Sequence, residues 1–387
     1  MKKIMSLYFA IMFIIGTDTF LISPLLPTLR TSFNISVETS GLLVSAYAIG
    51  YAVFALIAGP LSDIWNRKKV MLFGILGFSV STFLCAFAVN FWMMFLFRML
   101  AGIFAAFTSP QVWATIPILV PSEKITKAMG IASAGFAVSQ TLGVPIGTYL
   151  AAHSWKTPFY IIGGCALLLF ILIFLVVPDF KPTVTDKQSS MFGRYVTLLQ
   201  KKTARISYLS YFALLIGAFA VFTFASTWLS DKFSLSVSGI GNVMVFVGLG
   251  NFIGSFLGSN IIIKLGRRNA LISGTAIMGV LYVLITFSPS ILLINVGFFL
   301  IYLAFGSIFP IVMAHLQSLT TTSRGTVAAL SNVTNYAATT LGAYLAGILY
   351  VQFRGFIGVT VFAGICCLIS IELWTRNQMA ENQRLSN

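Results

Sequence analysis

The sequence predicts an all-α polytopic membrane protein whose twelve transmembrane helices form two pseudo-symmetric six-helix bundles. Three observations predict this class. Hydrophobic residues make up 58% of the chain and charged residues 9%, whereas about 25% charged is usual in soluble domains. The mean hydropathy is +0.95, and apolar runs long enough to cross a bilayer recur along the chain. Finally, one charged loop pattern occurs twice.

Windows of about 20 apolar residues give six spans in each half. In the first half they lie at 4–26, 41–61, 70–89, 91–117, 126–150 and 158–178. In the second half they lie at 206–229, 238–263, 270–288, 291–313, 325–349 and 356–375. We therefore expect an N-terminal bundle over 1–178, a cytoplasmic linker over 179–205 that has room for one short surface helix, and a C-terminal bundle with a short cytoplasmic tail over 206–387.

The repeated loop supports this division. Residues 59–69 carry Asp63 and three consecutive cations, and residues 258–268 repeat the pattern about 200 positions later without the acid. Aligning Arg67 with Arg267 also aligns Gly74 with Gly274. Self-similarity at this spacing indicates two related halves, as in transporters built from parallel repeats.

Lysine and arginine positions predict the orientation. If the chain starts in the cytoplasm, 19 of its 24 basic residues lie in cytoplasmic segments, which are the two termini, the loops on that side and the linker. The exceptions are Arg30, Lys156, Lys232 and Arg354 outside and Arg98 within a span. The positive-inside rule then predicts both termini in the cytoplasm, with the protein in the plasma or inner membrane. No small-x-small cleavage site ends the first apolar run, so we expect an uncleaved first span.

Several function classes are disfavoured. Loop cations account for the net charge of +15, and no separate basic domain would bind nucleic acid. The four cysteines lie in apolar runs without metal-ligand spacing, so we expect neither metal nor cofactor. The chain has no phosphate-binding Gly-x4-Gly-Lys-Ser/Thr loop, no cluster of catalytic side chains and no selectivity-filter segment. A monomeric secondary transporter of a small molecule, powered by the proton gradient across its bilayer, fits best.

Asp18 is the only acidic residue inside a predicted span and away from its ends, and Arg98 is the only such basic residue. A carboxylate in hydrocarbon is costly unless it is neutralised, is paired or faces water. Asp18 is thus the leading candidate to take up and release a proton, and a packing hydrogen bond is the alternative. Arg98 keeps its charge, and the rise of a helix places both residues in the outer half of the bilayer. We expect them to communicate directly or through water, so that protonation of Asp18 releases Arg98 or admits substrate.

Neutral polar and aromatic residues within the spans are candidates to line a substrate cavity. Asn332, Asn335 and Tyr336 share a helix face by i, i+3, i+4 spacing, and Tyr47 and Tyr51 form an i, i+4 pair. Core packing and hydrogen bonds between helices account for the same residues. The remaining candidates are Phe107, Gln111, Gln140, Phe222, Asn251 and Phe305.

Three motifs carry a family resemblance. Gly59-x-Leu61-Ser62-Asp63-x3-Arg67-Lys68-Lys69 resembles the signature loop between spans two and three of the major facilitator superfamily. Arg98-x3-Gly102 resembles its span-four arginine motif. Leu142-Gly143-Val144-Pro145-Ile146-Gly147-Thr148 resembles the span-five antiporter motif of its 12-span drug:proton antiporters, in the arabinose-efflux-permease-like branch. The resemblance covers essentially the whole chain. Two positions depart: the acid is Asp18, where the branch often has Glu at the site of Thr19, and Asn66 replaces a glycine.

The resemblance implies the major facilitator fold, alternating access and export driven by proton entry. The loop residues Gly59, Asp63, Arg67 and Lys68 would stabilise closure at the cytoplasmic side. Arg98 would assist proton coupling, and Gly143, Pro145 and Gly147 would form a flexible contact on span five. A cavity with one acid and many aromatic rings suits small hydrophobic or cationic drug-like compounds, hence multidrug efflux and antibiotic resistance. Export of a sugar, nucleobase or other small metabolite, which the Asn and Gln side chains would suit, is the alternative.

Overall fold

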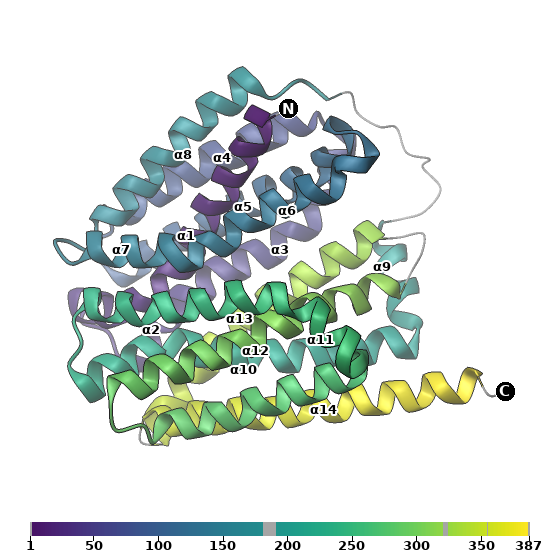
Figure 1. The fold of residues 1–387 in the computed structure, drawn as a ribbon. Coiled ribbons are helices and arrows are strands. Elements are labelled where there is room, and N and C mark those ends of the chain that lie inside the picture. The colour runs from purple at the N-terminus through teal and green to yellow at the C-terminus, as the bar shows by residue number, and fades with distance from the viewer. Residues whose placement is uncertain (1, 181–190, 320–323, 354, 386–387) are drawn as a thin grey trace. The chain divides into compact units, whose positions relative to one another are not determined.

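The computed structural model describes residues 2–180, 191–319, 324–353 and 355–385 (Figure 1). Within these ranges, the side chains at 59–64, 122, 126, 191–192, 194, 258–264, 267, 324–325 and 377–385 lie outside the description. All regular secondary structure in the described part of the chain is helical. The predicted all-α class is therefore confirmed.

The first half of the chain contains the six predicted spans. Five of them are single helices: α1 (Lys2–Phe33), α3 (Leu42–Ile64), α4 (Arg67–Cys85), α5 (Phe91–Leu119) and α8 (Thr157–Val176). The short helix α2 (Val37–Ser40) precedes α3. The span predicted at 126–150 has three parts, which are α6 (Ile125–Val138), the π-helical turn η2 (Ser139–Gly143) and α7 (Val144–Ala151), and the 3-10 turn η1 (Ser122–Lys124) precedes it.

The second half repeats this order. Its helices are α10 (Lys202–Phe233), α11 (Val237–Thr286), α12 (Ile291–Ser318), α13 (Arg324–Gln352) and α14 (Phe356–Leu385). The predicted spans at 238–263 and 270–288 both lie in α11, which is interrupted by a non-helical residue at Gly266. The short helix expected in the linker is α9 (Met191–Gln200).

Eleven segments of the described chain are long and apolar enough to cross a membrane. The predicted span at 325–349 is not among them, although its helix α13 is 29 residues long. Serine, threonine and asparagine side chains lower its hydropathy: Thr326, Ser331, Asn332, Thr334, Asn335, Thr339 and Thr340. By its position in the chain, α13 corresponds to the eleventh of the twelve predicted spans, and α14 to the twelfth.

The repeated loops break the helix at equivalent positions. Asn66 has extended backbone angles and caps α4 by accepting a hydrogen bond from the Lys68 N–H over 2.9 Å. Its side-chain amide also donates to Asp179 Oδ1 over 2.9 Å. Gly266, which aligns with Asn66, has φ 74°, a conformation that favours glycine. Asn66, which replaces the glycine of the family pattern, is thus the N-cap residue at which α4 starts.

Helix packing also repeats between the halves. A side chain at Gly50 would collide with the carbonyl oxygen of Met99, and one at Gly250 would collide with that of Phe299. Both pairs are offset by 200 positions, as are the first residues of α1 and α10 at Lys2 and Lys202. Small residues at helix interfaces let the backbones approach in this way. The two halves are therefore related in packing as well as in sequence.

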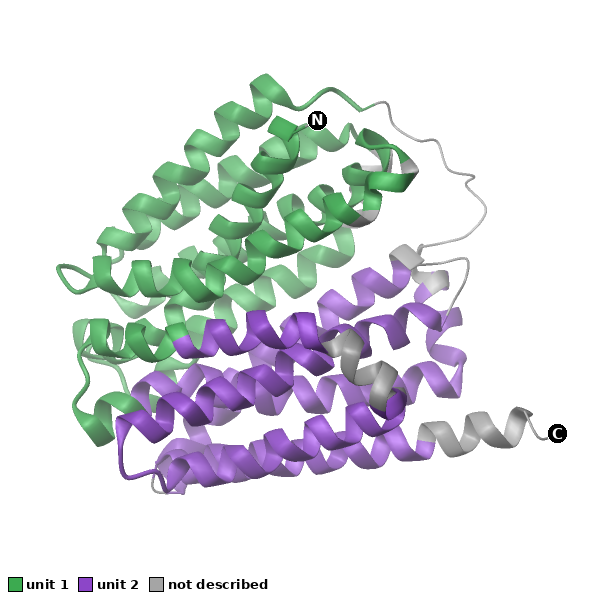
Figure 2. Cartoon of the chain, in the orientation of Figure 1, with its two compact units in different colours: residues 1–186, 229–245 green, residues 187–228, 246–387 purple. Residues whose placement is uncertain are grey.

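Figure 2 shows the two compact units into which the chain divides. Unit 1 comprises residues 1–186 and 229–245, and unit 2 comprises 187–228 and 246–387. The boundaries expected from the sequence, at the linker over 179–205, stay a prediction.

We expect Gly102→Ala to lower thermal stability. The added Cβ would collide with the carbonyl oxygen of Tyr47, so α3 and α5 would have to separate, at a cost of about 1–3 kcal/mol. Size-exclusion chromatography of heated, detergent-solubilised protein measures the loss. The matched control is Gly130→Ala on α6, because that Cβ would meet no neighbouring atom of the described residues within 4 Å beyond the adjacent backbone of its own helix. Equal losses in both variants would contradict the packing argument.

Candidate functional site

Asp18 of α1 and Arg98 of α5 form a buried ion pair within unit 1. Arg98 Nη1 donates a hydrogen bond to Asp18 Oδ2 over 2.7 Å, and Nη2 donates to the Asp18 backbone carbonyl over 3.3 Å. Both side chains are fully buried. The two charges that the sequence singled out therefore touch directly, and their role in proton coupling stays a prediction.

The ion pair is incompletely satisfied. Asp18 Oδ1 and Arg98 Nε have no hydrogen-bond partner among the described residues, whereas buried polar atoms are normally paired. Removing one partner of a buried ion pair costs about 3–5 kcal/mol, because the other charge is left uncompensated. Oδ1 is an oxygen that can accept a proton without first breaking a hydrogen bond.

Only the first half carries this pair. Positions offset by 200 from Asp18 and Arg98 hold Ala218 and Phe298, both buried. The helices match at this offset, since α5 starts at Phe91 and α12 at Ile291. The pseudo-symmetry of the fold therefore does not extend to the ionisable groups at these positions.

Tyr47 of α3 covers the guanidinium of Arg98. The Arg98 Cζ lies 4.6 Å from the centre of the Tyr47 ring, and the tyrosine is 2% exposed. A desolvated cation–π contact of this kind contributes about 2 kcal/mol. The Thr19 hydroxyl donates to the Ile15 carbonyl over 2.8 Å and lies 3.0 Å from the Tyr47 hydroxyl. The i, i+4 spacing of Tyr47 and Tyr51 indicated that they share a face of the helix, but it could not show that this face contacts Arg98.

The antiporter motif packs against the turn of α1 that carries Asp18. A side chain at Gly143 would collide with Thr17 Oγ1, and the Cβ of one at Gly147 would lie 2.6 Å from Leu21. The motif is part α-helix and part π-helix, with the Val144 N–H bonded to the Ser139 carbonyl. Such π-helical turns are frequent at functional sites.

Pro145 accounts for the π-helical turn. A proline has no N–H to donate to the carbonyl four residues earlier, here Thr141, and its ring crowds that carbonyl. The equivalent position in α13 is Leu345, and α13 runs without interruption from Arg324 to Gln352. The family resemblance implied a flexible contact at Pro145 but not that it would take the form of a π-helical turn.

The signature loop is described in part. Arg67 Nη1 donates to the Ala114 carbonyl of α5 over 2.8 Å, and Lys68 Nζ lies 5.6 Å from the centre of the Phe174 ring on α8. Arg67 therefore joins the start of α4 to α5. The side chains of Gly59 and Asp63 lie outside the described residues, so the gate role of this loop stays a prediction.

The other cavity candidates of unit 1 lie in different surroundings. Phe107 packs with Ala58 and Val70 in a hydrophobic cluster. Tyr51 is buried beside Tyr47, with ring centres 6.5 Å apart. Gln111 is fully buried, and neither of its amide atoms has a hydrogen-bond partner among the described residues. Gln140 is half-buried in η2.

The candidates of unit 2 lie on α10, α11, α12 and α13. Phe222 and Phe305 both contact the Tyr302 ring, at centre distances of 6.2 and 6.1 Å. The backbone of Asn251 packs against Gly306. On α13, Asn332 and Asn335 are half-buried and Tyr336 is buried. A substrate cavity formed by these candidates stays a prediction.

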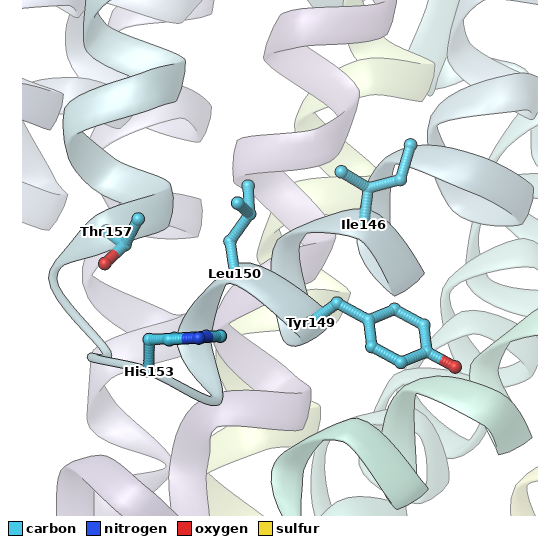
Figure 3. A pocket seen from close by; sticks show the side chains of 5 residues that line it. All are labelled: Ile146, Tyr149, Leu150, His153 and Thr157. Carbon is cyan, nitrogen blue, oxygen red and sulfur yellow. The ribbon is translucent and has the colours of Figure 1, made fainter.

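An open hollow of about 430 Å³ lies at the end of α7 and the start of α8 (Figure 3). Its lining residues are Ile146, Tyr149, Leu150, His153 and Thr157. None of these was predicted as a site residue for transport. Within the described residues, no group of three or more His, Cys, Asp or Glu could hold a metal ion.

Known sequences match nearly the whole chain. A family model described as Major Facilitator Superfamily matches residues 8–224 and 207–386. YceJ of Bacillus subtilis (strain 168), an uncharacterized MFS-type transporter, is 48% identical over 368 residues, which cover 95% of this chain and 94% of the relative. The quinolone resistance protein NorA of Staphylococcus aureus (strain N315) is 26% identical over 353 residues, which cover 90% of each chain.

Solved structures share the fold at lower identity. A bacterial homologue of the human lysosomal transporter Spinster, inward-facing and occupied, has a TM-score of 0.80 at 17% identity and covers 97% of this chain and 96% of its own. A D-xylose–proton symporter has a TM-score of 0.76 at 17% identity, with 95% and 96% coverage. At these identities the likeness concerns the fold alone.

Proposed function

The chain belongs to the Major Facilitator Superfamily, and from this premise we propose that it exports small hydrophobic or cationic compounds in exchange for protons. Members of this family are membrane transporters, so the chain is a multi-pass transporter of small molecules and not an enzyme. The proposal concerns the direction of transport, the coupling ion and the substrate.

The buried ion pair of Asp18 and Arg98 is the observation that carries the proton coupling. A proton on Asp18 would neutralise the carboxylate and leave Arg98 without its counter-charge. For a proton that enters the cell, a pH difference of one unit supplies about 1.4 kcal/mol, and a membrane potential of 100 mV supplies about 2.3 kcal/mol. Together these amount to about 3.7 kcal/mol, which lies within the roughly 3–5 kcal/mol lost when a buried pair loses one partner. A physiological proton gradient is therefore comparable in size with the cost of this step.

Drug-like substrates are supported by the aromatic content and by one relative. Phe, Tyr and Trp make up 14% of the chain, and aromatic rings favour hydrophobic and cationic ligands. The relative NorA is named a quinolone resistance protein. We therefore propose multidrug efflux and antibiotic resistance as the biological role.

Export of a sugar, nucleobase or other small metabolite is the second candidate. It is favoured by Asn332 and Asn335, which are half-buried on one face of α13. Amide side chains both donate and accept hydrogen bonds, as recognition of a neutral polar metabolite requires.

The remaining parts of the proposal follow from the loop cations and motifs. The protein would act as a monomer in the plasma or inner membrane, with both termini in the cytoplasm. Gly59, Asp63, Arg67 and Lys68 would close the cytoplasmic side. Gly143, Pro145 and Gly147 would form the flexible contact of span five against α1.

Purified protein in liposomes tests the proposal. With an imposed pH difference, we expect substrate to move against the direction of proton flow, and we expect a protonophore to stop it. The substrate panel contains ethidium, norfloxacin, a pentose and a nucleoside. Transport that is indifferent to the pH difference would contradict proton coupling, and movement of the pentose or nucleoside alone would favour the metabolite alternative.

A further inference from the structure

The Arg98 guanidinium contacts two other helices of unit 1, α1 and α3, and of these partners only the Asp18 carboxylate changes charge when Asp18 is protonated. Nη1 and Nη2 are bonded to the carboxylate and backbone carbonyl of Asp18 on α1. One face of the group lies against the Tyr47 ring on α3, 4.6 Å from Cζ to ring centre. The attraction of the ring for the cation does not depend on the proton on Asp18.

Tyr47 is itself held from two sides. Its carbonyl oxygen packs directly against Gly102, one turn beyond Arg98 on α5, which fixes α3 close to the arginine. Its hydroxyl lies 3.0 Å from Thr19, the residue after Asp18. The ring is therefore placed by the two helices that carry the ion pair.

We propose that Tyr47 is a positioning residue, which holds Arg98 edge-on to Asp18 and so sets the pH at which transport is half-maximal. The inference rests on the proposed proton coupling and deepens it. Without the ring, the guanidinium is free to rotate away, the ion pair weakens, and Asp18 binds a proton at higher pH. The midpoint of the pH profile then moves upward.

The other titratable side chains near the pair are few. Tyr51 lies one turn from Tyr47 on α3, and the buried thiol of Cys85 on α4 lies near both charges. The α6–η2–α7 segment presents Ser139 and Gly143 to this turn of α1. None of these side chains is placed over the guanidinium as Tyr47 is.

The test is the pH profile of substrate transport in liposomes for a series at position 47. We expect Tyr47→Phe to keep the wild-type midpoint, because the ring remains, and Tyr47→Leu to raise it by about one pH unit. The control is Tyr8→Leu, which removes a buried tyrosine of α1 that is bonded to Thr115 and should leave the midpoint unchanged.

Fluorinated phenylalanines at position 47 keep the shape of the ring and weaken its attraction for cations, so they decide the question even where Tyr47→Leu does not fold. We expect the midpoint to rise with each added fluorine. A midpoint that is constant through the fluorinated series, or an equal shift from Tyr8→Leu, would overturn the inference. Wild-type protein without proton exchange would overturn the proposed function, and this inference with it. Proton exchange whose pH midpoint is the same in all variants at position 47 would overturn this inference and leave the proposed function standing.

Discussion

Asp18→Asn is expected to abolish proton-driven transport in liposomes, with a loss of at least about 100-fold at an imposed pH difference. Asparagine keeps the size and can still accept a hydrogen bond from Arg98, but it neither carries a charge nor binds a proton. Substrate exchange without a gradient should persist and should no longer vary with pH. Counterflow of labelled substrate across a range of pH values measures this residual exchange.

The matched control is Glu372→Gln. Glu372 also pairs with an arginine, Arg376, over 2.6 Å, but their side chains are 59% and 70% exposed. Solvation makes such a pair nearly neutral in energy, so we expect wild-type transport. An Asp18→Asn protein with the wild-type pH profile would show that another group carries the proton.

Among the single substitutions proposed, Arg98→Met is expected to lower the free energy of unfolding most. It removes the counter-charge of a fully buried carboxylate, at a cost of about 3–5 kcal/mol. It also removes the cation that the Tyr47 ring covers. Denaturant unfolding of the detergent-solubilised protein, followed by tryptophan fluorescence, measures the change.

The double variant Asp18→Asn/Arg98→Met separates the ion pair from packing. Because no charge remains buried, we expect it to recover a large part of the stability that Arg98→Met loses, which is non-additivity of about 1–3 kcal/mol. Arg376→Met, on the exposed pair, should cost less than about 1 kcal/mol. Strictly additive losses in the double variant would show that Asp18 and Arg98 do not stabilise each other.

The sequence predicted most of the fold because burial in lipid leaves a strong local signal. Twenty apolar residues in a row cannot remain in water, so the spans could be read directly. The span at 126–150 shows the limit of this signal. Its length was predicted, but the π-helical turn at Ser139–Gly143 depends on how Pro145 redirects backbone hydrogen bonds.

The candidate site was predicted unevenly. Asp18 and Arg98 were found because a charge in an apolar run is conspicuous. Tyr47 was singled out as a cavity residue, and the structure places its ring on Arg98. Phe107 was named for the same reason and packs in a hydrophobic cluster. In a chain with 36 phenylalanines and 13 tyrosines, residue type does not tell one aromatic environment from another.

The sequence by itself determined the predicted spans and the two intramembrane charges, because both depend on each residue's own transfer energy between water and lipid. It also determined the repeat, because that is a similarity between two stretches of the sequence itself. Only the tertiary structure decided that Arg98 meets Asp18, that Tyr47 covers it and that Gly143 packs on Thr17. Those contacts join helices up to 126 positions apart, and their geometry depends on how closely the glycines let neighbouring backbones approach.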